Sequence, residues 1–175
     1  MKKAVLLSVC LLTILGCSSL PERKNPDQTI AVLKVNRVFY DNRDQETEKP
    51  KDFMPLHVYY ITMDDDPKLH VIQQEYEQYI ITDLAPGAHT ISSIMIRLAS
   101  SSVGKETAIP VSVPFELQPG FITILPQSFN IAIQMAGDYS YRTGQGFADL
   151  KPEERAAIVE KLSASPTFKT WELAE

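Results

Sequence analysis

Three histidines are the side chains best suited to acid–base chemistry near neutral pH or to holding a metal ion. They are His57, His70 and His89. A metal site needs further His, Cys or carboxylate ligands at a recognisable spacing, and none of the three histidines has one. The pattern therefore favours structural or exposed histidines, two of them on expected strands and His89 shortly after a turn.

Carboxylates and hydroxyls also form short runs, at Asp64–Asp66 and at Ser100–Ser102. Three neighbouring carboxylates could bind calcium, but the spacing of an EF-hand loop is missing, so a solvated turn ended by Pro67 is expected. The serines have no base nearby in the sequence, and the chain carries no nucleophile elbow, P-loop or dinucleotide fingerprint. We therefore expect no catalytic residue, metal or cofactor, and no enzymatic activity. A Ser–His–Asp set assembled through space is the alternative that stays open.

The beginning of the chain has the pattern of an export signal. Lys2 and Lys3 precede Ala4–Leu15, an apolar run of 12 residues broken only by Ser8 and Thr13. A helix that spans a bilayer needs roughly twenty residues, so this run is too short for a permanent span. Charge followed by a short apolar run is typical of a secretory signal peptide.

The end of this run, Ile14-Leu15-Gly16-Cys17, resembles the lipobox of bacterial lipoproteins. The resemblance implies that the Cys17 sulfur receives a diacylglyceryl group, that the chain is cleaved between Gly16 and Cys17, and that the new amino group of Cys17 is acylated, with fatty acids such as palmitate. Several acyl chains hold a protein stably on a membrane without a spanning helix. Ser18 resembles the signal that sorts lipoproteins to the outer membrane. The alternative is that Cys17 is merely the last residue of a cleaved or retained apolar segment.

Removing 16 of 175 residues leaves 159, enough for one domain with a sizeable core. The full chain has 17 Lys and Arg residues and 22 Asp and Glu residues. Cleavage would remove Lys2 and Lys3, so 15 positive and 22 negative residues would remain, a mature net charge of −7. An acidic chain without a basic run has no electrostatic reason to bind nucleic acid. Cys10 lies inside the signal, so the mature chain keeps only Cys17 and can form no internal disulfide.

The folded part of the chain carries the period-two pattern of β-strands. In Ile109–Leu117 and in Phe129–Met135, every second residue is apolar. Pro110 and Pro114 cannot donate ladder hydrogen bonds, so the first of these strands is expected to lie at a sheet edge or to carry an interruption. Further strands are expected at 31–40, 56–63, 69–74, 76–83, 88–98 and 121–125. The sequence thus predicts a mainly β protein, a single antiparallel β-sandwich of about seven to nine strands with a short C-terminal helix.

A Leu-x-Pro-Gly sequence occurs twice, at Leu84–Gly87 and at Leu117–Gly120, and each copy is expected to form a hairpin turn. The segment Tyr79–Pro126, which contains both copies, resembles the small β-sandwich domains of bacterial surface proteins. Domains of the PEGA, carboxypeptidase-regulatory-like and DUF2846 types share this pattern. The resemblance implies a non-catalytic module of the cell envelope.

The C-terminal part changes character. A Tyr- and Gly-rich loop is expected at 137–146, followed by a helix from Pro152 to about Ser163, with glutamates in its first turn. Phe168 and Trp171 follow the helix. The helix and these aromatic residues either close one end of the sandwich or offer a contact to a partner, because a lone Trp can anchor an interface.

The expected organisation is a signal peptide at 1–16, a lipidated tether at 17–29, a β-sandwich at 30–147 and a C-terminal helix and tail at 148–175. A tether of this length reaches at most about 40 Å. The expected function is that of a membrane-anchored binding or structural module, held by the lipid on Cys17 and contacting an envelope protein or polymer. The alternatives are a lipid-anchored hydrolase of the envelope and a carrier of a small apolar ligand.

Overall fold

The computed structural model describes residues 20–41, 43, 45–48, 56–64, 66–71, 73–75, 78–98, 106–135 and 141–175. The expected cleavage and lipidation residues, Gly16 and Cys17, lie outside this part of the chain. So do Asp65 of the acidic run and Ser100–Ser102.

Seven strands form the larger of two sheets. Its main path runs β10-β9-β1-β6-β5, while β2 adds to β1 and β11 adds to β9. The two central strands, β1 and β9, lie parallel to each other, from the pair Ile30 and Ile122 to the pair Tyr40 and Gln134. The bounds are β1 (Ile30–Tyr40), β2 (Glu46–Thr47), β5 (Gln73–Glu75), β6 (Gln78–Thr82), β9 (Phe121–Met135), β10 (Tyr141–Asp149) and β11 (Glu172–Leu173).

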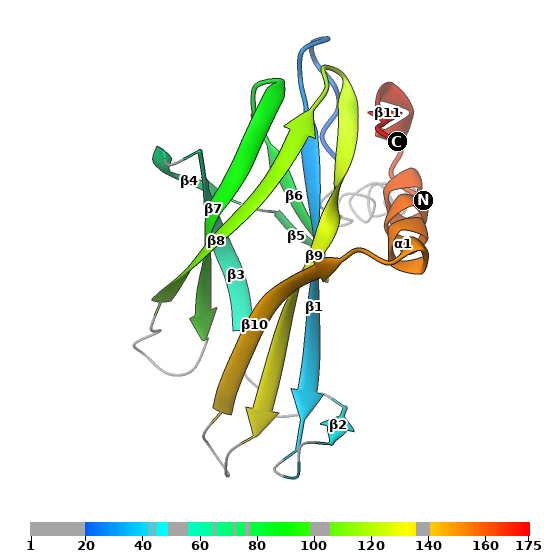
Figure 1. Ribbon diagram of the computed structural model, residues 1–175. Helices are drawn as coiled ribbons and strands as arrows, with labels where there is room; N and C mark the ends of the chain where they lie inside the picture. The colour runs from blue at the N-terminus through cyan, green and yellow to red at the C-terminus, as the bar shows by residue number, and fades with distance from the viewer. Residues whose placement is uncertain are drawn as a thin grey trace, which may run out of the picture.

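Four antiparallel strands form the smaller sheet, in the order β4-β3-β7-β8. Their bounds are β3 (Leu56–Met63), β4 (Asp66–Val71), β7 (Gly87–Leu98) and β8 (Glu106–Leu117). Figure 1 shows the two sheets facing each other as two layers. The predicted fold class is therefore confirmed, with the parallel pairing of β1 and β9 as a departure from a purely antiparallel sandwich. The edge position predicted for 109–117 is also confirmed, since β8 ends its sheet.

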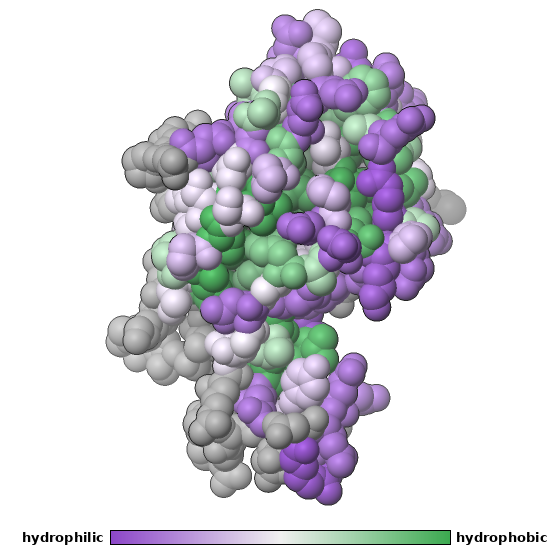
Figure 2. All heavy atoms as spheres, in the orientation of Figure 1, coloured by the Kyte–Doolittle hydropathy of each residue, from purple (hydrophilic) through white to green (hydrophobic). Residues whose placement is uncertain are grey.

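A first apolar core lies between the two sheets. Alternate residues of β1, such as Ala31, Leu33 and Val35, point into it and are fully buried. Figure 2 shows apolar side chains gathered in the middle of one face of the molecule, surrounded by polar ones. Val111 of β8 and Phe147 of β10 are partly buried against this core, and each belongs to the edge strand of its own sheet. The core therefore comes close to the surface along the open side between the layers.

A second apolar core covers the outer face of the larger sheet. The other residues of β1, Ile30 and Val32, point into it, together with Ile158 and Leu162 of α1 (Pro152–Ser163). The predicted bounds of this helix are confirmed, but it lies against the outer face of the larger sheet and not across one end of the sandwich (Figure 1). Covering on both faces explains why β1 begins with a continuous apolar run.

Polar contacts fix the start of α1 on the sheet. The Glu154 carboxylate accepts a hydrogen bond from the Lys151 backbone N–H at 3.1 Å and another from the Asn36 side chain at 2.8 Å. Asn36 also donates to the Asn130 side chain at 3.0 Å. The hydrogen bond from Lys151 is the main cause that lowers the pKa of Glu154, so this carboxylate stays ionised at the positive end of the helix.

The two predicted strands at 121–125 and 129–135 are one continuous strand, β9. Val32 pairs with Ile124, an offset of 92, whereas Lys34 pairs with Ser128, an offset of 94. β9 thus holds two extra residues beside Pro126. Because two is an even number, side chains before and after the irregularity keep the same faces.

The Leu-x-Pro-Gly sequences do form turns, and Gly87 and Gly120 both have positive φ, at 125° and 83°. The prediction that they close hairpins is wrong. The first turn leads from β6 in the larger sheet to β7 in the smaller sheet, and the second leads from β8 back to β9. Both turns therefore carry the chain from one layer to the other.

The loop predicted at 137–146 is also partly wrong, because β10 begins at Tyr141 and pairs with β9 along its length. Gly144 and Gly146 interrupt the apolar alternation that identifies a strand in the sequence. β10 is an edge strand whose residues 143–146 are exposed, so its sequence has little need of apolar residues there.

Replacing Ile158 by Ala tests the second core. The Ile158 side chain is 1% exposed, and its loss should lower the free energy of unfolding by about 2–5 kcal/mol, since a cavity opens between helix and sheet. Urea denaturation followed by the fluorescence of the single tryptophan, Trp171, reports on this cluster directly. Ala157→Ser, at an exposed position of the same helix, is the matched control, and equal midpoints for the two variants would contradict the helix packing.

Candidate functional site

Asp64, the first residue of the acidic run, forms a polar pair with His89. Asp64 follows β3, and His89 lies on β7 just after the first Leu-x-Pro-Gly turn. The His89 Nδ1 atom is 2.6 Å from the Asp64 Oδ2 atom, and the Nε2 atom is 2.7 Å from the Ala85 carbonyl oxygen. The other Asp64 oxygen accepts the Thr90 backbone N–H at 2.6 Å.

Both ring nitrogens of His89 face hydrogen-bond acceptors, so the ring satisfies both contacts only when it is doubly protonated. Partial burial lowers the pKa of His89, but the hydrogen bonds to Ala85 and Asp64, together with the Asp64 charge, outweigh burial and raise this pKa above its ordinary value. The ring also lies beside Phe115, with 5.7 Å between ring centroids. His89 thus links the turn after β3 to the turn before β7, and both of its nitrogens are engaged within the chain.

The other two histidines lie on neighbouring strands, His57 on β3 and His70 on β4. In the register of these strands, His57 lies opposite Arg97, and His70 lies opposite Ile61. No group of three His, Cys, Asp or Glu residues that could hold a metal ion occurs among the residues that the structure describes.

A second site joins the two ends of the described chain. The 3₁₀ helix η1 (Phe168–Thr170) and the flanking Thr167 and Trp171 pack against the segment Leu20–Arg23. We call this contact, Leu20–Arg23 with Thr167–Trp171, the clasp. The Thr167 hydroxyl donates to the Leu20 carbonyl oxygen, and the indole N–H of Trp171 donates to the Pro21 carbonyl oxygen at 2.8 Å. Leu20 itself is 2% exposed and belongs to the second core.

The second Leu-x-Pro-Gly turn completes the clasp. A guanidinium nitrogen of Arg23 donates to the Gly120 carbonyl oxygen at 3.3 Å, and the Glu172 backbone N–H donates to the same oxygen at 3.2 Å. The Gly120 N–H donates to the Gln28 carbonyl oxygen at 2.9 Å. A Cβ atom at position 120 would lie 2.7 Å from the Arg23 guanidinium, so glycine suits this position by its size as well as by its positive φ.

These contacts bury the aromatic residues that follow the helix. Trp171 is 6% exposed, with its ring in the second core and its N–H bonded to the chain's own backbone. Phe168 is half-buried against the same cluster. Within the stretch expected to be a tether, 17–29, Leu20 is buried in the second core, and Pro21 and Arg23 form hydrogen bonds with the domain.

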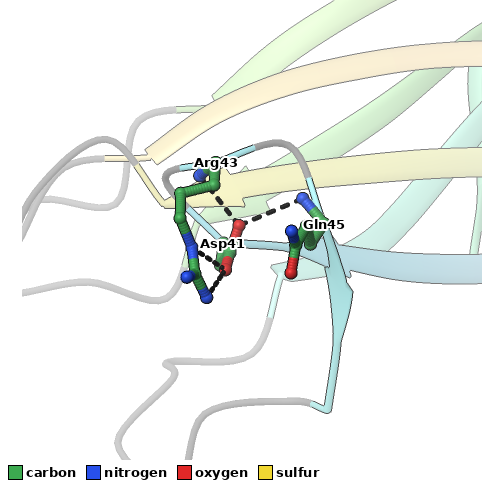
Figure 3. A network of polar contacts seen from close by, with 3 residues as sticks. All are labelled: Asp41, Arg43 and Gln45. Atoms are coloured by element: carbon green, nitrogen blue, oxygen red, sulfur yellow. Dashed lines mark hydrogen bonds and ion pairs between the residues drawn. The ribbon is translucent and has the colours of Figure 1, made fainter.

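The opposite end of the larger sheet carries a tight polar turn at Asp41 (Figure 3). The Asp41 carboxylate accepts the backbone N–H groups of Arg43 and Gln45 at 2.8 and 3.0 Å, and the Arg43 guanidinium at 3.0 and 3.1 Å. The backbone hydrogen bonds from Gln45 and Arg43 are the main causes that lower the pKa of Asp41. This turn lies between β1 and β2 and presents an ion pair to solvent, with the Arg43 side chain 73% exposed.

A charged side chain of β1, Arg37, borders the first core. The Arg37 side chain lies on the same face of β1 as Val35 and Phe39, and its Nη2 atom donates to the Tyr79 hydroxyl at 2.9 Å. Its Nε atom is buried without a hydrogen-bond partner. Arginine keeps its charge in a protein, and the partial exposure of Arg37 leaves the rest of its guanidinium group near water.

Comparison of the chain with protein-family models, with curated proteins and with solved structures gave no match. Among the described residues, no helix has both the length and the apolar character that crossing a membrane requires.

The clasp can be tested by amide hydrogen exchange. Thr167→Val and Trp171→Phe each remove one hydrogen bond to the backbone of Leu20 or Pro21, and each should destabilise the docked segment by about 0.5–1.5 kcal/mol. The Arg23 amide, which donates to the Thr170 hydroxyl, should then exchange faster while amides of β7 keep their rates. Thr167→Ser keeps the hydroxyl and is the matched control. Unchanged exchange at Arg23 in both variants would show that the clasp does not hold this segment.

The His89 pair predicts a dependence of stability on pH. A histidine whose pKa is raised on folding contributes stability that is complete below its unfolded pKa, about 6.5, and is lost as pH rises through the higher folded value. The melting temperature of the wild type should therefore fall as pH rises above about 6.5, and this fall should be smaller in His89→Gln. Asp64→Asn should also reduce it. Equal pH profiles for the wild type and both variants would contradict the proposed protonation.

Proposed function

We propose that this chain is a lipid-anchored lipoprotein of the bacterial cell envelope, in which the β-sandwich serves as a non-catalytic binding or structural module. Lys2, Lys3, the short apolar run and the Ile14–Cys17 lipobox support export and acylation of Cys17. Ser18 favours the outer membrane over the inner membrane as the destination.

The clasp is the observation that best supports this proposal. Leu20, three residues after the expected lipidation site, is buried and bonded to the C-terminal part of the domain. A module that works while fixed to a membrane needs a firm connection between its anchor and its folded part. The clasp provides one through the backbone carbonyls of Leu20 and Pro21 and through the buried Leu20 side chain.

The non-catalytic part of the proposal is supported by how the chemically capable groups are used. The structure describes the side-chain contacts of one histidine, His89. Both of its ring nitrogens form hydrogen bonds within the chain, with Asp64 and Ala85. The carboxylate beside it, Asp64, accepts a backbone N–H on its other oxygen. We assign this pair a structural role, joining two turns at one end of the smaller sheet.

Metabolic labelling in the native host tests the anchor. The wild type should incorporate an alkyne-tagged palmitate and lose its first 16 residues, whereas Cys17→Ala should incorporate none and keep its signal peptide. Cys10→Ala, which removes the cysteine inside the signal, is the matched control and should be labelled and cleaved like the wild type. Labelling and normal cleavage of Cys17→Ala would refute the lipoprotein assignment.

The role of the module is tested by photocrosslinking from intact membranes, with the crosslinker at the exposed position Gln45 of the far turn. A specific crosslinked envelope protein or polymer, obtained from the acylated and correctly localised protein, would support a binding module. A folded, localised protein that yields no crosslink there and instead hydrolyses an envelope polymer would overturn it.

A further inference from the structure

We infer that the face formed by the clasp, η1 and β11 lies against the lipid headgroups, and that the larger sheet projects away from the membrane. This inference rests on the proposed acylation of Cys17. It adds an orientation: the domain has one membrane-facing side and does not turn freely on a long tether.

The first argument is the length of chain between the anchor and the clasp. Cys17 and Leu20 are three Cα–Cα steps apart, and at 3.8 Å a step they can be separated by at most about 11 Å. Without the clasp, the first fixed residue would be near Thr29, twelve steps from Cys17, and the limit would rise to about 40 Å. The clasp therefore shortens the free connection roughly fourfold and holds the acylated residue close to η1.

The second argument is the direction of the strands. β11 pairs with Phe121 and Ile122 at the start of β9, and Ile30 at the start of β1 pairs with Ile122 as well. β1 and β9 run parallel, so both lead away from the clasp (Figure 1). From Ile30 to Tyr40, ten steps of about 3.3 Å give a distance on the order of 33 Å. The Asp41 turn thus lies at the far end of the sheet.

The third argument is the chemistry of the clasp face. Its exposed side chains carry both signs, with Glu22 and Glu172 beside Lys24 and Lys169. A surface with charges of both signs can lie against a headgroup layer, but it lacks the polybasic patch that would attract it there. The acyl chains therefore supply the attraction to the membrane, and the clasp sets the orientation of the domain. Phe168 lies half-buried on the same face, where an aromatic ring is tolerated at a membrane–water boundary.

Fluorescence quenching on vesicles tests the orientation. The mature chain has no cysteine besides Cys17, so acylated protein carrying Lys169→Cys or Gln45→Cys can be labelled at one site with a thiol-reactive fluorophore. Both positions are exposed, one on the clasp face and one on the far turn. On phosphatidylethanolamine–phosphatidylglycerol vesicles that contain a headgroup-nitroxide lipid, quenching should be several-fold stronger at position 169 than at position 45.

The outcomes separate the two proposals. Mass spectrometry and vesicle flotation first establish acylation and membrane binding, and their failure refutes the lipoprotein assignment and this inference with it. Acylated, vesicle-bound protein with equal quenching at both positions, or stronger quenching at position 45, refutes the orientation alone. Adding Trp171→Phe and Thr167→Val to the labelled protein should reduce the difference between the positions, and Thr167→Ser should preserve it.

Discussion

Burial of the β1–β9 pair on both faces is the constraint on which the rest of the structure depends. One face of this pair forms the first core with the smaller sheet, through residues such as Leu33 and Phe129. The other face would expose Ile30, Val32, Ile122 and Ile124 to water if nothing covered it. The helix, η1 and the N-terminal segment supply that cover. Because both faces of β1 and β9 are apolar, the sheet needs the C-terminal part of the chain to cover its outer face.

This constraint also explains the path of the chain. A parallel pair such as β1 and β9 cannot be joined by a tight turn. After β1 ends, the chain must therefore travel back to the end of the sheet where β1 began before it can start β9. On the way it enters the smaller sheet twice, and the two Leu-x-Pro-Gly turns make two of the four passages between the described strands of the two layers, from β6 to β7 and from β8 to β9. Both turns contact the incoming N-terminal segment, because the Thr29 hydroxyl donates to the Leu84 carbonyl oxygen and Gln28 accepts from Gly120. The entry of the chain and these two passages are thus gathered at the clasp end.

Local patterns predicted the local parts of this fold. Alternation at 109–117 and the Pro152–Glu154 helix start are short-range signals, and both elements were found where they were expected. What the sequence did not reveal depends on pairs that are distant along the chain. The Pro-Gly sequences predict a positive φ at Gly87 and Gly120, but they do not predict whether the next strand joins the same sheet or the other one. Asp64 and His89 are 25 residues apart, and Pro21 and Trp171 are 150 apart, so no spacing rule connects them.

The separation of 150 residues between Pro21 and Trp171 has a consequence for the order of events during synthesis. A chain made from its N-terminus emerges with residues 20–23 long before their partners exist, so this segment cannot form its contacts until almost the whole domain has been made. Closure of the clasp then marks the completed molecule, and a truncated chain lacking its last few residues would keep a loose N-terminus.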